Sequence, residues 1–129
     1  MLQLNKVHHI ALICSDYQKS LEFYTRVVGC QVIAEHWREE QQSYLTKLSL
    51  NGEYVIELFS YPSPPQRPSY PEAAGLRHLA FEVDDIEEQV AELDRLGVAH
   101  EAIRTDMTTG KHFVFFNDPD DQPLEMYEK

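Results

Sequence analysis

Residues 9–16 read HIALICSD and residues 78–85 read HLAFEVDD, so one short pattern occurs twice, 69 positions apart. In both copies, large apolar residues occupy every second position: Ile10, Leu12 and Cys14 in the first, and Leu79, Phe81 and Val83 in the second. This alternation is typical of a strand with one buried face. In each copy an aspartate then stands where a helix N-cap belongs, and an amphipathic stretch of about a dozen residues follows. The two stretches therefore predict a strand followed by a helix, present twice.

The repeat extends well beyond these two stretches. A glycine ends each predicted helix, at Gly29 and at Gly97, and each copy closes with an apolar strand that carries a glutamate. These glutamates, Glu57 in VIELF and Glu125 in PLEMY, lie 68 positions apart. That period exceeds the roughly 20–50 residues of solenoid repeats. We therefore interpret the chain as a duplicated module of one strand, one helix and several further strands.

The rest of each copy predicts strands joined by turns. Asn51-Gly52 is a strong two-residue hairpin signal. The segment between the copies is rich in proline, so we expect it to be a stiff, extended linker. The further strands are predicted at residues 31–37, 43–50 and 53–61 in the first copy, and at 98–104, 112–117 and 123–129 in the second. The expected boundaries are about 5–61 for module 1, 62–75 for the linker and about 76–128 for module 2.

Length and composition suit one globular domain of ordinary size. The chain has 129 residues, with 11 Lys and Arg against 22 Asp and Glu, and a net charge of −11. Such an acidic chain argues against nucleic acid or an anionic membrane as a partner. No apolar run approaches the roughly 20 residues of a membrane helix, and the N-terminus lacks the apolar core of a signal peptide, so we expect a cytoplasmic protein. Cys14 and Cys30 are expected to be reduced thiols.

Two histidines and two glutamates hold matching places in the repeat. His9 and His78 open the two copies, and Glu57 and Glu125 follow them by 48 and 47 positions. A lone histidine is more often an ordinary core or surface residue, but an ionised carboxylate between apolar strand residues is costly unless it is paired or bound to a cation. Two imidazoles and two carboxylates form a mixed nitrogen and oxygen set that suits a borderline divalent cation. We therefore predict a metal site.

The other histidines lack this duplication. His8 has the opposite strand parity from His9, so we expect it to be a surface or supporting residue. His36, His100 and His112 have no counterparts in register. Other side chains share the ligands' faces and would either line an apolar pocket or pack in the core: Ile13, Val55, Phe59, Tyr61 and Tyr127.

The chain resembles the vicinal oxygen chelate superfamily over roughly residues 5–128. The resemblance rests on the H-x-A that starts each module, on the I/L-E-L/M that ends each, and on NDPDDQPLEMYE, which is similar to the family's closing DPDG…E segment with Asp121 in place of the usual glycine. It implies an α+β fold in which two tandem βαβββ modules form a half-open mixed sheet within a single domain. It also implies one divalent ion per site (Ni, Zn, Co, Mn or Fe) held by His9, Glu57, His78 and Glu125.

The complete ligand set resembles the glyoxalase I-like branch of this superfamily. Fosfomycin-resistance enzymes and extradiol dioxygenases lack a ligand at the position of Glu57, methylmalonyl-CoA epimerase usually has glutamine there, and bleomycin-resistance proteins have lost the ligands. The resemblance implies a lyase of the lactoylglutathione lyase type, acting on a small α-hydroxycarbonyl or hemithioacetal-type substrate through a metal-stabilised enediolate. Glu125 would be the base and Glu57 its partner on the opposite face. Bacterial glyoxalase I holds glutathione at positions that here are Ile13 and Tyr61, which leaves the thiol open.

Two other functions stay compatible with the sequence. One is a metal-free or non-catalytic small-molecule-binding module of the resistance type, and the other is a different superfamily enzyme, such as an epimerase or dioxygenase. Small bacterial proteins that this chain resembles pair their modules across a homodimer, and a stiff linker favours the same arrangement. We expect shared active sites, each with His9 and Glu57 from one chain and His78 and Glu125 from the other, although one chain could also supply all four.

Overall fold

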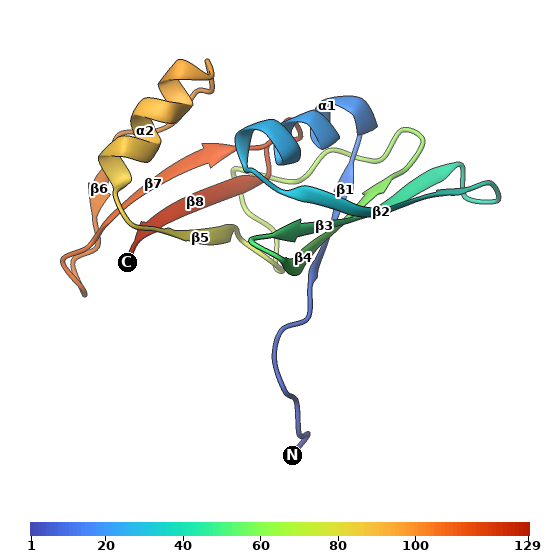
Figure 1. The fold of residues 1–129 in the computed structure, drawn as a ribbon, viewed down its shortest axis with the longest axis horizontal. Coiled ribbons are helices and arrows are strands. Elements are labelled where there is room, and N and C mark those ends of the chain that lie inside the picture. The colour runs from blue at the N-terminus through green and yellow to red at the C-terminus, as the bar shows by residue number, and fades with distance from the viewer. The chain divides into compact units, whose positions relative to one another are not determined.

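The computed structural model describes residues 1–129 as two compact units, Met1–Pro65 and Gln66–Lys129 (Figure 1). Each unit contains a strand, a helix and three further strands, and each forms a four-stranded sheet of its own. In each sheet the first strand runs parallel to the last, and the remaining neighbours are antiparallel. This confirms the predicted α+β class and the two βαβββ modules.

The first unit begins with β1 (Ile10–Cys14) and α1 (Tyr17–Glu22), and continues with β2 (Gln31–Arg38), β3 (Ser43–Leu50) and β4 (Glu53–Ser60). The order of its sheet is β1-β4-β3-β2. The carboxylate of Asp16 caps α1 by accepting from the backbone N–H of Lys19, as the sequence predicts. The helix then widens into the π-helical segment η1 (Phe23–Val27), and Gly29 adopts a φ of 89°, which residues with a side chain rarely take.

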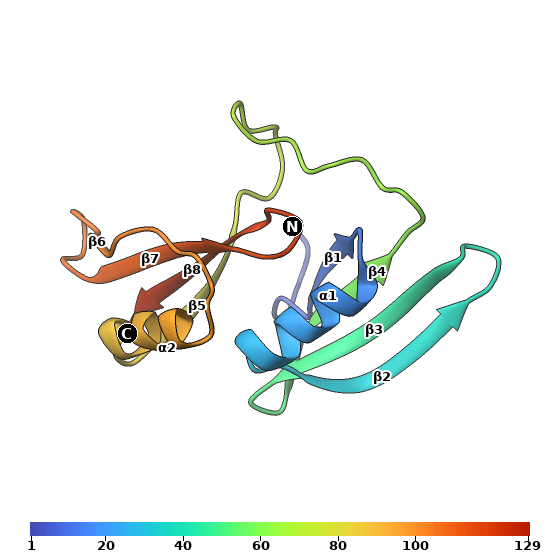
Figure 2. The same cartoon turned by 90° about the horizontal axis from the view of Figure 1, so that it is seen from above.

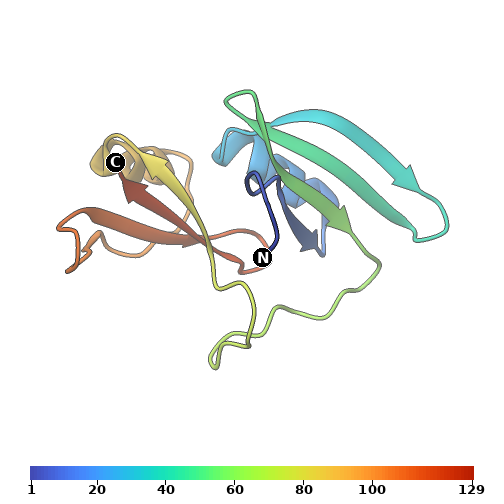
Figure 3. The ribbon, with the colours of Figure 1, turned by 90° about the horizontal axis from the view of Figure 1, so that it is seen from below.

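Helix α1 covers one face of this sheet and leaves the other face without a helix (Figures 2 and 3). The alternation predicted for β1 is present, because Cys14 is buried whereas Ala11 and Ile13 are exposed. In β4, Ile56 and Leu58 are fully buried on the helix side. The residue between them, Glu57, therefore stands on the open face. The buried core of the unit consists of Cys14, Tyr17, Tyr24, Cys30, Leu48, Ile56 and Leu58.

The second unit repeats this plan with β5 (Leu79–Val83), α2 (Ile86–Arg95), β6 (Arg104–Thr105), β7 (His112–Asn117) and β8 (Pro123–Glu128), in the sheet order β5-β8-β7-β6. Asp85 caps α2 by accepting from the backbone N–H of Glu88. Gly97 follows the helix with a φ of 72°. The turn before β8 places Asp121 at a φ of 61°, a conformation that glycine adopts freely and aspartate tolerates. The buried core consists of Ile86, Leu93, Val114, Phe116, Leu124 and Met126.

The strand predicted over residues 98–104 is largely absent. Only β6 forms there, together with one isolated bridge between His100 and Phe116. One ring nitrogen of His100 lies 2.7 Å from the carbonyl oxygen of Glu101, and the other lies 2.7 Å from the carboxylate of Asp94. The second contact ties the segment to α2. Before β6, the pairing with β7 is limited to the bridge and to one backbone bond from the N–H of Glu101 to the carbonyl of Phe115 (2.9 Å). Alternating polarity does not show how far such backbone pairing extends.

The proline-rich region forms no strand. Residues 66–77 belong to the second unit and lead into β5 as a loop. The guanidinium of Arg67 closes this loop, since it donates to the carbonyl of Arg77 (3.0 Å) and pairs with the carboxylate of Glu72 (3.0 Å).

None of the helices in the chain is long and apolar enough to cross a membrane.

Candidate metal centre

The parallel strand pair of each unit carries one histidine and one glutamate on the open face of the sheet. In the first unit, Ala11 of β1 lies directly opposite Glu57 of β4. His9 precedes Ala11 by two residues, so the period of a strand places it on the same side. The methyl side chain of Ala11 leaves the space beside the carboxylate to the imidazole, which gives a physical reason for the H-x-A pattern. The second unit repeats this arrangement with His78, Ala80 and Glu125.

In each unit the imidazole faces the carboxylate. Nε2 of His9 lies 3.7 Å from Oε1 of Glu57, and Nε2 of His78 lies 3.0 Å from Oε2 of Glu125. Two ligands at about 2.1 Å from a shared ion stand about 3.0–3.4 Å apart when they subtend roughly 90–109°. The second pair matches this separation and the first exceeds it by a few tenths of an ångström. The side chains therefore fit joint ligation of a divalent cation.

The carboxylates are also poorly exposed. Glu125 is 8% exposed, and the side chain of Glu57 is 17% exposed. The only ion-pair partner of each is its histidine, and no lysine or arginine pairs with either of them. A desolvated carboxylate without a cation costs free energy, so this donor set fits a bound divalent ion.

The far ring nitrogens of the two histidines have different surroundings. Nδ1 of His9 lies 2.8 Å from Nδ1 of His8, so one of these imidazoles donates to the other. Nδ1 of His78 is buried and has no hydrogen-bond partner. Metal-binding histidines usually direct their second nitrogen at an acceptor, which fixes the ring orientation. His8 thus supports His9, in the role expected for it, whereas His78 has no such support within its unit.

Tyr54 contacts both His9 and Glu57, although simple alternation along β4 would place its side chain on the opposite face of the sheet. In the register of β3 with β4, Ser49 pairs with Tyr54 and Leu48 pairs with Ile56, which leaves Val55 without a partner on β3. This extra residue is a bulge, and a bulge re-aims the side chains beside it. Tyr54 consequently points toward the site. No sequence pattern indicates the bulge.

The hydroxyl of Tyr54 donates to Oε2 of Glu57 at 3.0 Å. Burial, followed by the bond to this carboxylate, raises the pKa of Tyr54 to about 12. The ring also packs against His9, with centroids 5.0 Å apart. Lys47 lies opposite Glu57 on β3, and its ammonium stands 5.8 Å from the centre of the Tyr54 ring without an ion pair to Glu57. Glu57 is therefore held in place by a neutral hydroxyl.

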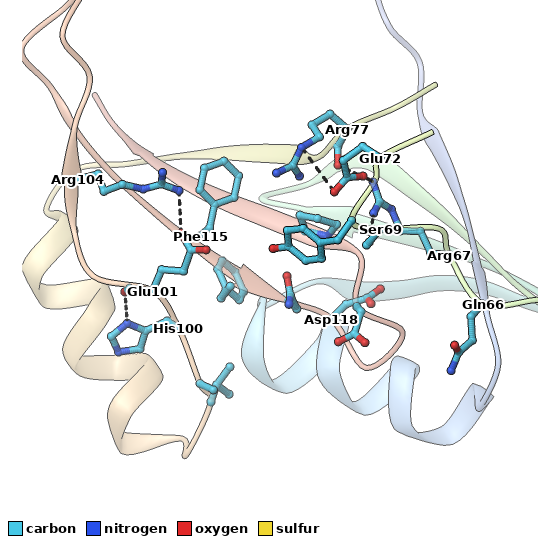
Figure 4. Close-up of a pocket in the computed structure, with 17 residues that line it drawn as sticks. Gln66, Arg67, Ser69, Glu72, Arg77, His100, Glu101, Arg104, Phe115 and Asp118 are labelled. Atoms are coloured by element: carbon cyan, nitrogen blue, oxygen red, sulfur yellow. Dashed lines mark hydrogen bonds and ion pairs between the residues drawn. The ribbon is translucent and has the colours of Figure 1, made fainter. Parts of the chain in front are cut away.

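A pocket of about 740 Å³ adjoins the second half of the site (Figure 4). Phe115 lines it and also packs edge-on against His78, with centroids 5.0 Å apart. His78 and Glu125 themselves are not among the lining residues. Three arginines of the wall are paired with glutamates of the wall: Arg67 and Arg77 with Glu72, and Arg104 with Glu101. The pocket is thus a polar recess beside the His78–Glu125 pair.

The four predicted ligands are divided between the units. His9 and Glu57 meet in the first, and His78 and Glu125 meet in the second. Neither unit holds a cluster of three or more His, Cys, Asp or Glu side chains that could bind a metal. Tyr127, considered as an apolar wall, instead donates its hydroxyl to the carboxylate of Asp106 at 2.8 Å. The four-ligand site remains a prediction that needs both units.

The sequence model of the Glyoxalase/Bleomycin resistance protein/Dioxygenase superfamily matches residues 6–126. The chain belongs to this superfamily. It is 60% identical over 126 residues to "Uncharacterized protein YwkD" of Bacillus subtilis, and the match covers 98% of each chain. It is 56% identical to "Uncharacterized protein YaeR" of Escherichia coli over the full length of both.

Solved structures of the superfamily share the fold. A glyoxalase family protein from Enterococcus faecalis superposes with a TM-score of 0.90 and 44% identity, covering 95% of this chain and 97% of that chain. A more distant relative has a stated activity. Lactoylglutathione lyase of Schizosaccharomyces pombe is 29% identical over 142 residues, which cover 94% of this chain but 46% of the enzyme.

Proposed function

We propose that this chain is a divalent-metal-dependent lyase or isomerase, of the glyoxalase I type, acting on a small α-hydroxycarbonyl or hemithioacetal-type compound. The observation that carries the proposal is the duplicated pair of a histidine and a poorly exposed glutamate that has no lysine or arginine partner. His9, Glu57, His78 and Glu125 would hold the cation. When bound, the cation would polarise a carbonyl oxygen and stabilise the negative charge that develops as a proton leaves the neighbouring carbon.

The two glutamates would move that proton. Oε2 of Glu57 already accepts a hydrogen bond from Tyr54, so this oxygen is occupied. Glu125 receives no such bond, and its one close polar neighbour is Nε2 of His78. Glu125 is therefore the stronger candidate for the base that takes the proton from carbon, and Glu57 would return a proton from the opposite face.

A homodimer would bring the two halves together. Each unit offers one imidazole and one carboxylate, so a complete site needs a first unit and a second unit. Pro62, Pro64 and Pro65 stiffen the segment between β4 and the second unit, which favours pairing between chains over pairing within one chain. Two such chains would carry two equivalent sites, related by a two-fold axis. We also propose that this dimer works in the cytoplasm.

Solvent exchange tests the proposed chemistry. The protein would be loaded in turn with Ni, Zn, Co, Mn and Fe, and its metal content measured. Dihydroxyacetone in D₂O would then report, by proton NMR, the loss of hydrogen from the carbon next to the carbonyl. We expect exchange with at least one metal, and a loss of about 100-fold or more in Glu125→Gln, the magnitude typical of removing a general base.

Glu82 provides a matched control on the same sheet face. It lies on β5 opposite Tyr127 and is exposed, so Glu82→Gln should leave the exchange rate unchanged. Full exchange in Glu125→Gln, or an equal loss in Glu82→Gln, would remove Glu125 from the mechanism. A wild-type protein that takes up no divalent metal would refute the proposal in favour of a metal-free binding module.

A further inference from the structure

The open face of the first sheet carries an arginine whose charge has no partner. Five of the six arginines in the chain are paired with a carboxylate: Arg26, Arg67, Arg77, Arg95 and Arg104. Arg38, at the end of β2, is the sixth. Its Nη2 donates to the hydroxyls of Ser43 (2.8 Å) and Tyr61 (3.2 Å), and both of these acceptors are neutral. Arg38 is therefore the one arginine of the chain whose guanidinium makes no ion pair with a carboxylate.

The guanidinium of Arg38 is also only partly satisfied. Its Nε is buried and has no hydrogen-bond partner. The carbon at the centre of the guanidinium lies 4.8 Å from the centre of the Phe59 ring and 5.7 Å from that of Tyr61, so aromatic faces hold the group flat. An unpaired donor and a desolvated charge both cost free energy. An anion beside the guanidinium would supply the missing charge and accept from N–H groups that Ser43 and Tyr61 leave unused.

The position of Arg38 relates it to the proposed reaction. Phe59, which lies against the guanidinium, follows Glu57 by two residues along β4, a rise of about 7 Å. Ile13 of β1 lies opposite Phe59 and is exposed on the same face. The ring under the guanidinium thus lies on the same face of β4 as the carboxylate of Glu57, two residues along the strand.

We propose that Arg38 binds an anionic group of the substrate, a carboxylate or a phosphate ester, so that the substrate class is an anionic α-hydroxycarbonyl compound. The assignment of an α-hydroxycarbonyl group to that compound rests on the proposed function, whereas the anion site is inferred only from Arg38 and its neighbours. Ser43 and Tyr61 orient the guanidinium, and Phe59 sets the plane in which the anion lies.

Three probes share the group HOCH₂–CO– and differ in charge: hydroxypyruvate carries a carboxylate, dihydroxyacetone phosphate carries a phosphate ester, and dihydroxyacetone is neutral. Each would be titrated into metal-free, ¹⁵N-labelled protein while the arginine Nε–H signals are followed by NMR. We expect the Arg38 signal to shift with saturation for at least one anionic probe and to remain still with dihydroxyacetone. The anion that binds more tightly identifies the headgroup.

Variants then assign the effect to the guanidinium. Arg38→Gln should weaken binding of the anionic probe about 10- to 100-fold, and Arg38→Lys should recover part of this loss, since it restores the charge without the planar fork. Arg104→Gln is the matched control. Arg104 lies over Phe113 and Phe115 in the second unit as Arg38 lies over Phe59, but it is paired with Glu101, so its loss should leave binding unchanged.

Several outcomes would overturn the anion site: no shift of the Arg38 signal with either anion, equal binding of the neutral probe, or an equal loss in Arg104→Gln. Failure of the proposed function is distinguishable. Saturable binding at Arg38 without proton exchange in any metal-loaded protein would retain the anion site and refute the reaction. Proton exchange with the same kcat/KM for neutral and anionic probes would retain the reaction and refute the anion site.

Discussion

Mixing two inactive variants tests whether each metal site is shared between chains. In the first variant, His9→Ala removes the imidazole of the first unit, and in the second, Glu125→Ala removes the carboxylate of the second unit. A homodimer of either variant carries one lesion in both of its sites. We expect both homodimers to lose stoichiometric metal, because a site that keeps three of its four protein ligands binds a divalent ion much more weakly.

The expected recovery follows from how the ligands are divided. His9 and Glu57 face each other at 3.7 Å in one unit, and His78 and Glu125 face each other at 3.0 Å in the other, so each substitution disables one pair only. In a mixed dimer with shared sites, one site receives both lesions and the other keeps both pairs intact. Each mixed dimer should therefore bind one ion, half of the wild-type content. Random pairing of equal amounts makes about half of all dimers mixed, so the unfractionated mixture should recover about a quarter.

The assay uses chains with two different affinity tags, which are unfolded together, refolded with metal and purified over both tags in turn. Metal per dimer is then measured by mass spectrometry of the elements, and the molar mass by light scattering. The matched control mixes His9→Ala with Glu57→Ala. These lesions lie in the same unit, so every site of the mixed dimer keeps one of them and no metal should return.

Two results would refute the shared site. One is a mixed dimer of His9→Ala and Glu125→Ala that stays metal-free under conditions in which the wild-type dimer loads fully. The other is a wild-type protein that binds its metal as a monomer at micromolar concentration. Equal recovery in the control mixture would show that a single lesion does not prevent binding, and would count against the ligand assignment itself.

Three further perturbations test other parts of the structure. Tyr54→Phe removes the hydroxyl that donates to the metal-site glutamate, so metal affinity in a chelator competition should fall about 10-fold, and an unchanged affinity would contradict a positioning role. Leu58 is fully buried, so Leu58→Ala should lower the free energy of unfolding by about 2–5 kcal/mol in urea, and a loss below about 1 kcal/mol would contradict its place in the core. The carbonyl of Glu101 and the carboxylate of Asp94 raise the pKa of His100, so its charged form stabilises the folded state. The wild type should therefore have a higher free energy of unfolding than His100→Gln, and this difference should be complete below about pH 6.5, the ordinary histidine pKa. It should shrink as the pH rises through the raised pKa of the folded state. A difference that stays constant between pH 5 and about 9 would contradict this.

The sequence by itself determined the duplicated plan and the pairing of the candidate ligands within each module. Alternation along a strand has a period of two, so the residue types in HIALICSD and HLAFEVDD are enough to show which face of each strand is buried. A glutamate between apolar neighbours in the last strand of each copy is then forced onto the open face. The helix cap at Asp16 follows from equally local chemistry, whereas the choice of Asp85 over Asp84 as the second cap came from the structure.

Departures from the predicted elements arise from the register and hydrogen bonding of neighbouring strands and helices. The bulge at Val55 adds one residue to β4, and this re-aims Tyr54 toward Glu57 against the alternation. The strand expected at residues 98–104 shrinks to β6 and one isolated bridge between His100 and Phe116, while the ring of His100 contacts Asp94 of α2. Both effects depend on register and on hydrogen bonds that no periodicity encodes.

Only the tertiary structure revealed the unpaired charge of Arg38. In the sequence it is one arginine at the end of a strand, 23 residues before Tyr61. Because β2, β3 and β4 are antiparallel neighbours in one sheet, the end of β2 lies close to the end of β4, and the guanidinium lies over Phe59. Whether a charge is paired depends on what surrounds it in space, and in a sheet those surroundings come from neighbouring strands rather than from neighbouring residues.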